Sequence, residues 1–421
     1  MDTHLHGSAR GHRSIGTPCD GVTWRAPAVK RPNGARLVPA MLGLLMVGAA
    51  IGGASGWTLA QEREQDPPMG PAIFVGDTAL KPYDPTPALV TRETRVEKAK
   101  FPATDIHAHW PASVDPAALL KAMDDLGVER SVNLSGGFGA QLDRMLSRYH
   151  EGAPGRLVIF ANLDLSRIDE PTFAADHVQM LERTKTTGMA GLKIFKNLGL
   201  TVTDRTGRVV PVDDPRLDPI WAACGRLRIP VLIHSADPVA FFGPIDERNE
   251  RWLQLQRHPD WSFHGPQFPA REEVLAQRDR VIARHPQTTF IGAHLGDNAE
   301  DLAALAGRLE RYPNFVVDLS AREAELGRQP YTARRFLIRW QDRVLFGTDR
   351  YPGREDQPRH RLYYRLLETD DEYFKYYDHP FPPTGEWRVH GLYLPDAVLK
   401  KIYQSNADRV LGWRVRDRRP E

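Results

Sequence analysis

The segment TDIHAHW (residues 104–110) places two histidines, His107 and His109, at the end of a short run of apolar residues. In a β-strand, side chains two positions apart point to the same face, so both imidazoles would share one face. The spacing alone decides little, because a second pair, His4 and His6, occurs in THLHG near the N-terminus. Whether His107 and His109 bind a metal has to be judged from the sequence around them.

From residue 101 onward, short apolar segments alternate with segments that have the apolar period of a helix. We predict strands at residues 103–109, 130–135, 156–163, 191–196, 230–235, 288–294, 314–320 and 343–349, and helices at residues 115–127, 271–286, 299–313 and 396–412. Strands that are apolar on both faces and separated by helices indicate a parallel sheet. Eight such units predict an α/β fold, the (β/α)8 TIM barrel.

The main alternative is a doubly wound open sheet. Such a sheet usually has a glycine-rich phosphate turn after its first strand, and HAHWPAS (residues 107–113) is not one. Three long connections follow predicted strands: a hairpin that turns at residues 204–207, then residues 236–270, then residues 350–395. In a barrel these long loops lie at the C-terminal face, where we expect lids or binding loops.

The N-terminal part differs in composition from the barrel. Residues 1–36 form a basic extension with six Lys or Arg against two Asp, and residues 37–60 carry no charge. The uncharged segment is long enough to span a bilayer with its positive flank on the cytoplasmic side. It is either a cleaved secretory signal or a transmembrane anchor. We therefore expect an exported (periplasmic or extracellular) or membrane-anchored protein, with residues 61–100 as an extended linker and residues 101–421 as the barrel.

Composition limits the partners. The net charge is +2 in 421 residues, and we find no basic cluster on the folded part, which argues against nucleic-acid binding. Two cysteines cannot build a disulfide framework. A small-molecule substrate is the expected partner, the membrane is a further one if the N-terminal segment is retained, and a homo-oligomer is left open.

Ionisable side chains recur where the predicted strands end. His107 and His109 end the first strand, His234 the fifth, His294 the sixth and Asp349 the eighth. A closed barrel would bring these side chains around one central point. Buried polar groups need partners, and imidazoles with a carboxylate suit Zn²⁺. The five positions together predict a metal centre more strongly than any single histidine does.

The order of DIHAH, GLKIFK, VLIHSAD, FIGAHLGD, LFGTD and YQSNADRVLG resembles the amidohydrolase superfamily over residues 101–413. It is most similar to the amidohydrolase-related branch that includes aminocarboxymuconate-semialdehyde decarboxylase and the resorcylate decarboxylases. The resemblance implies one divalent metal, Zn²⁺, bound by His107, His109, His234 and Asp349. It also implies that His294 is the catalytic histidine, which activates water or polarises the substrate.

These implied roles agree with metal chemistry. Zn²⁺ lowers the pKa of its bound water toward about 7, Asp349 could take the proton as hydroxide attacks, and His294 could stabilise the developing oxyanion. We expect a hydrolase that acts on a small carbonyl, amide or lactone substrate. A non-oxidative decarboxylase with the same metal site is the alternative, and a non-catalytic barrel that binds metal or solute is a third interpretation.

Lys193 in GLKIFK has two interpretations. As a carboxylated lysine it would bridge to a second metal, as in some amidohydrolases. Otherwise it contacts the substrate or forms an ion pair with Asp105, which an alternating strand would place on the same face as His107. Further side chains that could contact a substrate are Trp110, Asp237, Asp297, Arg322 and Arg350, which closely follow strand ends, and His264, which lies in a long loop.

Overall fold

The computed structural model describes residues 73–75, 78–80, 86–353, 359–377 and 384–413. By its contacts the chain divides into two units, Met1–Ala60 and Gln61–Glu421, and every described residue belongs to the second. The predicted signal or anchor at residues 37–60 therefore lies outside the described residues. Within the described ranges, no helix has the length and apolar character needed to cross a membrane.

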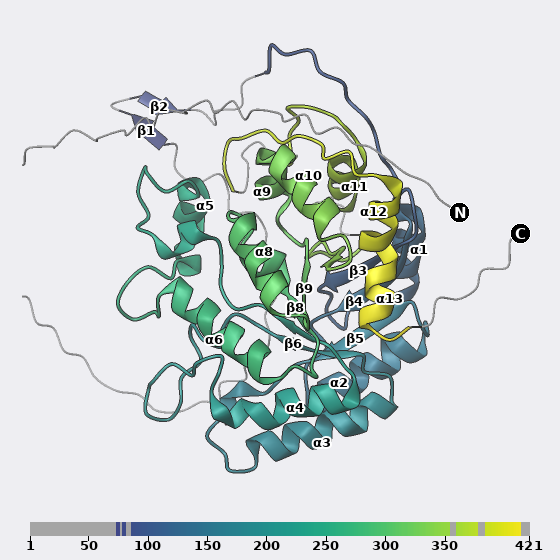
Figure 1. Cartoon of the computed structure of the whole chain (residues 1–421), viewed down its shortest axis with the longest axis vertical. Helices are drawn as coiled ribbons and strands as arrows, with labels where there is room; N and C mark the ends of the chain where they lie inside the picture. Colours follow the sequence, from purple (N-terminus) through teal and green to yellow (C-terminus); the bar gives the residue numbers. More distant parts are fainter. Residues whose placement is uncertain (1–72, 76–77, 81–85, 354–358, 378–383, 414–421) are drawn as a thin grey trace, which may run out of the picture. The chain divides into compact units, whose positions relative to one another are not determined.

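Eight parallel strands form the barrel, and a ring of helices surrounds them (Figure 1). The strands are β3 (Ala103–Ala108), β4 (Val128–Asn133), β5 (Leu157–Ala161), β6 (Gly191–Ile194), β7 (Val231–Ile233), β8 (Phe290–Gly292), β9 (Phe315–Asp318) and β10 (Val344–Leu345). Each strand pairs in parallel with the next one along the chain. The predicted (β/α)8 barrel is confirmed.

The barrel closes between its first and last strands, at the β3–β10 seam. The regular sheet ladder ends there, with β10 at one edge and β3 at the other. Two backbone hydrogen bonds cross the seam: the Ile106 amide donates to the Phe346 carbonyl at 3.0 Å, and the Asp349 amide donates to the His107 carbonyl at 2.8 Å. The seam thus joins the strand that carries the histidine pair to the segment that carries Asp349.

The helices lie mainly in the connections between strands. They are α1 (Pro116–Leu126), α2 (Gly139–Met145), α3 (Phe173–Thr186), α4 (Asp218–Leu227), α5 (Trp252–Arg257), α6 (Arg271–Arg284), α7 (Ala293–Gly296), α8 (Leu302–Arg311), α9 (Glu323–Arg328), α10 (Pro330–Arg339), α11 (Arg359–Glu368), α12 (Asp396–Lys400) and α13 (Asn406–Val410). Helix α1 shows why the boundaries fall where they do. The Asp115 carboxylate accepts from the Ala118 amide at its start, and Gly127, with φ +74°, ends it.

The structure agrees with one predicted connection and differs from the sequence prediction in other segments. Residues 203–209 form the expected hairpin, with a bridge between Thr203 and Val209. The connections of residues 236–270 and 350–395 contain α5 and α11, respectively, so neither is one long loop as predicted. The predicted linker contains two short paired strands, β1 (Ile73–Val75) and β2 (Thr78–Leu80). The predicted helix at residues 396–412 is interrupted by the π-helical turn Lys401–Ser405.

Side-chain alternation sorts the apolar residues into two layers. On β7, Val231 and Ile233 join the outer cluster between strands and helices, whereas Leu232 joins an inner cluster. The inner cluster also contains Val316 of β9 and Ala407 of α13. By the same alternation, His234 and Asp318, two residues beyond Leu232 and Val316, point inward at the carboxyl ends of their strands.

A buried ion pair fastens α13 to the barrel. The Arg130 side chain of β4 bonds the Asp408 carboxylate at 2.5 Å, and its guanidinium lies 4.7 Å from the Trp413 ring. Both side chains of the pair are about nine-tenths buried. Because removal of one partner leaves a buried charge with little compensation, the pair makes the position sensitive to substitution.

We therefore expect Asp408→Ala to lower the free energy of unfolding by about 3 kcal/mol, measured by urea denaturation. The control is Lys121→Ala, which removes the exposed ion pair between Lys121 and Asp125 on α1 and should cost less than about 1 kcal/mol. Equal effects of the two substitutions would show that the Arg130–Asp408 pair does not stabilise the barrel.

Candidate metal centre

The histidine pair at the end of β3 is held from both sides by hydrogen bonds to Nδ1. His107 Nδ1 lies 2.9 Å from an Asp318 carboxylate oxygen, and His109 Nδ1 lies 2.7 Å from Ser135 Oγ. A carboxylate only accepts, so His107 Nδ1 carries the proton and its Nε2 keeps a free lone pair. Burial lowers the pKa of His109 well below its ordinary value, so that this imidazole is neutral at pH 7.

Asp349 faces the Nε2 atoms of both histidines across the β3–β10 seam. One of its carboxylate oxygens lies 3.4 Å from His107 Nε2 and 3.4 Å from His109 Nε2. Burial alone would raise the pKa of Asp349, but its electrostatic interactions with His107, His109 and the nearby arginines outweigh burial and hold the pKa well below its usual range. Asp349 is therefore an anion beside two imidazole nitrogens, and the three residues form one group that could hold a metal ion.

His294 and Asp318 form a second such group with His107. Asp318, fully buried at the end of β9, accepts from the His294 amide at 3.0 Å and from Ser320 Oγ at 2.5 Å. His294 Nδ1 lies 2.8 Å from the Ser320 carbonyl oxygen, which only accepts, so Nδ1 carries the proton and Nε2 is an acceptor. Burial, then unfavourable electrostatic interactions with His234 and Arg322, lower the pKa of His294 well below its ordinary value.

His234 lies beside these residues but joins neither group. Its ring centroid is 4.4 Å from that of His294, yet its Nε2 is buried with no hydrogen-bond partner among the described residues. The nearest carboxylate oxygens are those of Asp237 at 3.4 Å and Asp297 at 3.6 Å. A buried imidazole nitrogen without a partner is costly, and a bound cation would remove that cost.

Two aspartates, Asp237 and Asp297, lie beside His234. Asp297 accepts from the Ser235 and Ala236 amides, which fixes the chain after β7. Asp237 forms a short ion pair with Lys196. Burial alone would raise the pKa of Asp237, but Lys196 and His234 lower it to about 2. Asp237 is therefore engaged by Lys196, whereas Asp297 is engaged through Oδ2 alone: its Oδ1 is buried without a hydrogen-bond partner among the described residues and lies 3.6 Å from His234 Nε2.

Lys193 is buried inside the barrel, where its Nζ lies 5.3 Å from the centroid of the Phe195 ring. Burial lowers the pKa of Lys193 to about 8, although Asp318, Asp349 and Asp297 act in the opposite direction.

The prediction of an ion pair between Lys193 and Asp105 is wrong. Asp105 bonds His360 of α11 instead, because the β3–β4 register is irregular between Asp105 and Ala108 and regular alternation does not hold there.

Two further expected substrate contacts lie elsewhere. Trp110 is fully buried in the outer apolar cluster, with its ring 5.8 Å from Tyr149, so it packs between strands and helices. His264 is exposed, and its Nδ1 lies 3.2 Å from the Phe242 carbonyl. No described interaction joins His264 to the histidines at the strand ends.

The two predicted arginines are closer to the centre. Arg322 follows β9 and is nearly buried, and its guanidinium donates to its neighbour's carbonyl, that of Ala321, at 2.6 Å. Among the described ion pairs, none gives Arg322 a carboxylate partner within 4.0 Å. Arg350 follows Asp349, and its amide donates to Thr348 Oγ1 at 3.2 Å. Its positive charge helps to lower the pKa of Asp349.

Three residues that our sequence analysis missed are contacts of the histidines: Asp318, Ser320 and Ser135. Asp318 could have been found, because it is a carboxylate in the otherwise apolar segment NFVVDLS (residues 314–320). The serines carry no such signal, since a serine after a strand is common in any turn. Their hydrogen bonds to His107, His294 and His109 appear only when the strands are assembled.

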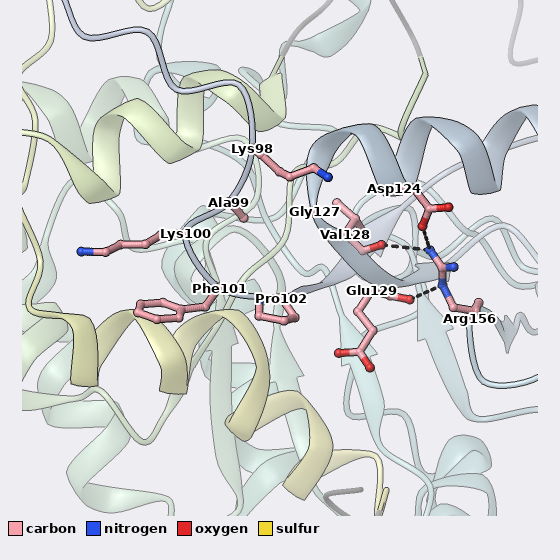
Figure 2. Close-up of a pocket in the computed structure, with 10 residues that line it drawn as sticks. All are labelled: Lys98, Ala99, Lys100, Phe101, Pro102, Asp124, Gly127, Val128, Glu129 and Arg156. Atoms are coloured by element: carbon pink, nitrogen blue, oxygen red, sulfur yellow. Dashed lines mark hydrogen bonds and ion pairs between the residues drawn. The ribbon is translucent and has the colours of Figure 1, made fainter. Parts of the chain in front are cut away.

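A hollow of about 570 Å³ lies at the opposite end of the barrel (Figure 2). Its lining includes Phe101 and Val128, which stand before or at the start of β3 and β4, at the amino ends of the strands. Figure 2 shows Arg156 bonded to Asp124 and to two backbone carbonyls. In TIM-barrel enzymes the chemistry is at the carboxyl ends of the strands, where the histidines of this chain lie.

Comparison with known proteins gives one family and several structures. A family model described as Amidohydrolase matches residues 97–413. No curated protein matches the chain. The chain is also similar to a 2,6-dihydroxybenzoate decarboxylase from Rhizobium, with 18% identity, coverage of 75% of this chain and 99% of that chain, and a TM-score of 0.44.

Two further solved structures show similarity of the same order. One is a dihydroxybenzoic acid decarboxylase from Polaromonas with bound manganese and 2-nitroresorcinol, at 16% identity, coverage of 75% and 97%, and a TM-score of 0.44. The other is a dihydroorotase from Campylobacter jejuni, at 13% identity, coverage of 77% and 88%, and a TM-score of 0.43.

The Asp237–Lys196 pair predicts a pH dependence of stability. The pKa of Asp237 is about 2 in the folded protein, against 3.8 for an ordinary aspartate, so the stabilisation is complete above pH 4 and is lost as the pH falls through 2. We expect Asp237→Asn to lower the unfolding free energy by about 2 kcal/mol at pH 6 and by much less near pH 2.5, as measured by urea denaturation. A constant difference between the two proteins over this range would contradict the assignment.

Proposed function

Because the chain belongs to the amidohydrolase family, we propose that it is a metal-dependent hydrolase that acts on a small carbonyl, amide or lactone substrate. The family match over residues 97–413 supports an enzyme with this barrel. The proposed centre consists of His107, His109 and Asp349, with His234 as the fourth ligand and His294 as the catalytic histidine.

One observation carries the proposal: both histidines of the pair are held at Nδ1 and aim Nε2 at the same carboxylate. Their Nδ1 atoms are engaged by Asp318 and Ser135, and each Nε2 lies 3.4 Å from Asp349. A carboxylate or hydroxyl on the far nitrogen of a histidine is the arrangement that orients histidines toward a metal. The donor set of imidazoles and carboxylate fits Zn²⁺, and His234 Nε2, which has no partner among the described residues, fits a fourth position.

The surrounding residues supply what hydrolysis needs. A divalent cation at this position would polarise a carbonyl and lower the pKa of a water molecule. His294 presents Nε2 as an acceptor and is neutral at pH 7, so it suits a general base that takes the proton of the attacking water better than an oxyanion donor. It then returns this proton to the leaving nitrogen or oxygen as the carbonyl bond to that atom breaks. The Lys193 ammonium offers a positive charge to a developing anion.

Decarboxylation with the same centre is the second candidate, and Arg322 is the observation that favours it. This nearly buried guanidinium lies near His294 and has no carboxylate partner within 4.0 Å among the described residues, so it suits a substrate carboxylate. Such a substrate would lose CO₂ as its carbon–carbon bond breaks, and a nearby acid such as the Lys193 ammonium would protonate the carbon that remains.

We further propose that residues 37–60 export the chain or anchor it in a membrane, on the basis of their uncharged length and basic flank. Fractionation of cells that produce the full chain tests this proposal. Full-length protein in the soluble cytosolic fraction alone would contradict it.

For the metal centre, we expect about one equivalent of zinc per chain in the reconstituted protein, measured by elemental analysis. His107→Ala and Asp349→Ala should each lose most of this metal, because each removes one of the converging ligands. His285→Ala, at a histidine near the amino ends of the strands, is the control and should retain it. A folded wild-type protein without metal after reconstitution would refute the proposal, and a second equivalent that is lost in Lys193→Ala would favour the carboxylated lysine.

The reaction type is tested on a panel of small amides, lactones and aryl carboxylates, read in parallel for hydrolytic products and for CO₂. We expect hydrolytic turnover, abolished in His294→Asn. Arg322→Gln should raise KM about 10-fold or more for carboxylate substrates and leave neutral substrates nearly unchanged, because it removes the charged partner. Release of CO₂ without hydrolysis would favour the decarboxylase, and binding without turnover would favour a non-catalytic barrel.

A further inference from the structure

We propose that Asp105 and His360 form a positioning pair that sets the geometry of the metal centre from outside the barrel. The inference rests on the proposed metal-dependent function, and it assigns a role to two residues that touch neither the substrate nor the metal. The pair lies behind β3, between the strand and α11, on the side away from Asp318 and the other groups inside the barrel.

The Asp105 carboxylate joins both ligand-bearing segments by their backbones. One carboxylate oxygen accepts from the His107 amide at 3.1 Å and from the Thr348 amide at 3.2 Å. The other oxygen accepts from Thr348 Oγ1 at 2.7 Å and from His360 Nε2 at 2.9 Å. Each oxygen therefore has two donors, and the bridge ends one residue before Asp349 and on the amide of His107 itself.

This bridge lies at the seam, where the sheet is least able to hold the strands in register. The regular ladder stops at β3 and β10, and the β3–β4 register shifts between Asp105 and Ala108. His107 and His109 are on one side of the seam and Asp349 is on the other. A shift of the two sides by a fraction of an ångström would change the distances between the two Nε2 atoms and the Asp349 carboxylate.

The backbone conformation of Asp349 is a second reason why the Asp105 bridge matters for the metal centre. Its φ is +63°, a left-handed conformation that is uncommon for a residue with a side chain and that neighbouring contacts have to hold. The constraints come from its own amide, which donates to the His107 carbonyl at 2.8 Å, and from Thr348, which Asp105 holds by both amide and hydroxyl. The Asp105 bridge thus supports the conformation that aims the Asp349 carboxylate at the histidines.

His360 donates the fourth hydrogen bond to the Asp105 carboxylate, and packing holds its own side chain in place. It is 3% exposed on α11, and its ring packs among Phe346 and Tyr364, with centroids at 6.4 and 6.5 Å. Without this donor, one lone pair of a fully buried carboxylate would be left unsatisfied, and Asp105 would be free to turn away from Thr348. We therefore infer that α11 controls the alignment of the metal ligands through His360.

The test is Co²⁺ binding to the metal-free full chain, followed by the visible spectrum of bound Co²⁺ and by titration. His360→Leu removes the donor and should weaken Co²⁺ binding about 10–100-fold and alter the spectrum. His360→Gln keeps an N–H donor near the position of Nε2 and should restore affinity to within a few-fold of the wild type. Thr348→Val, which removes only the hydroxyl donor, should also weaken binding.

The matched control is His285→Leu. His285 Nε2 bonds the Asp218 carboxylate of α4 at the same 2.9 Å, but His285 follows α6 and precedes β8, near the amino ends of the strands. It should lower thermal stability without changing Co²⁺ affinity or spectrum. Wild-type affinity and spectrum in both His360→Leu and Thr348→Val would overturn the proposal, as would no rescue by His360→Gln. A wild-type chain that binds no Co²⁺ or Zn²⁺ would instead refute the metal centre itself, and this inference with it.

Discussion

Closure of the barrel between β3 and β10 is the constraint on which the candidate centre depends. Seven strand pairs are held by a parallel ladder, whereas the eighth contact is held by two backbone hydrogen bonds and by the Asp105 carboxylate. The histidine pair and Asp349 meet only because this contact forms. Because only a few specific hydrogen bonds hold the seam, the backbone there can depart from a regular strand. Asp349 has a left-handed backbone, and the register of β3 against β4 is irregular.

Hydrogen bonds to Nδ1 hold three histidines of the centre in place. Asp318 orients His107 and holds the His294 amide, Ser320 connects these two histidines, and Ser135 orients His109. Such partners decide which nitrogen carries the proton, and so which nitrogen faces the centre. The residues that hydrogen-bond to the imidazoles therefore contribute to the chemistry of the centre as much as the imidazoles do.

Hydrolysis and decarboxylation make similar demands on this arrangement. Both need a positively charged centre that binds substrate oxygens, and both need a group that moves a proton. They differ in which bond breaks, and this depends on how the substrate is oriented. Arg322, which interacts electrostatically with His294, and Asp237, which lies beside His234 after β7, are close to the centre, so we expect this part of the chain to orient the substrate.

The sequence by itself determined the eight βα units and the strand ends at which His107, His109, His234, His294 and Asp349 stand. These features are local, because alternation and apolar runs depend on neighbouring residues. The tertiary structure decided that Asp105 pairs with His360 rather than with Lys193, and that Trp110 packs in the outer core. It also revealed Asp318 as a partner of two histidines. The Asp105–His360 and His107–Asp318 contacts join residues more than 200 positions apart, and the others depend on how the strands and helices pack, so no local pattern encodes these outcomes.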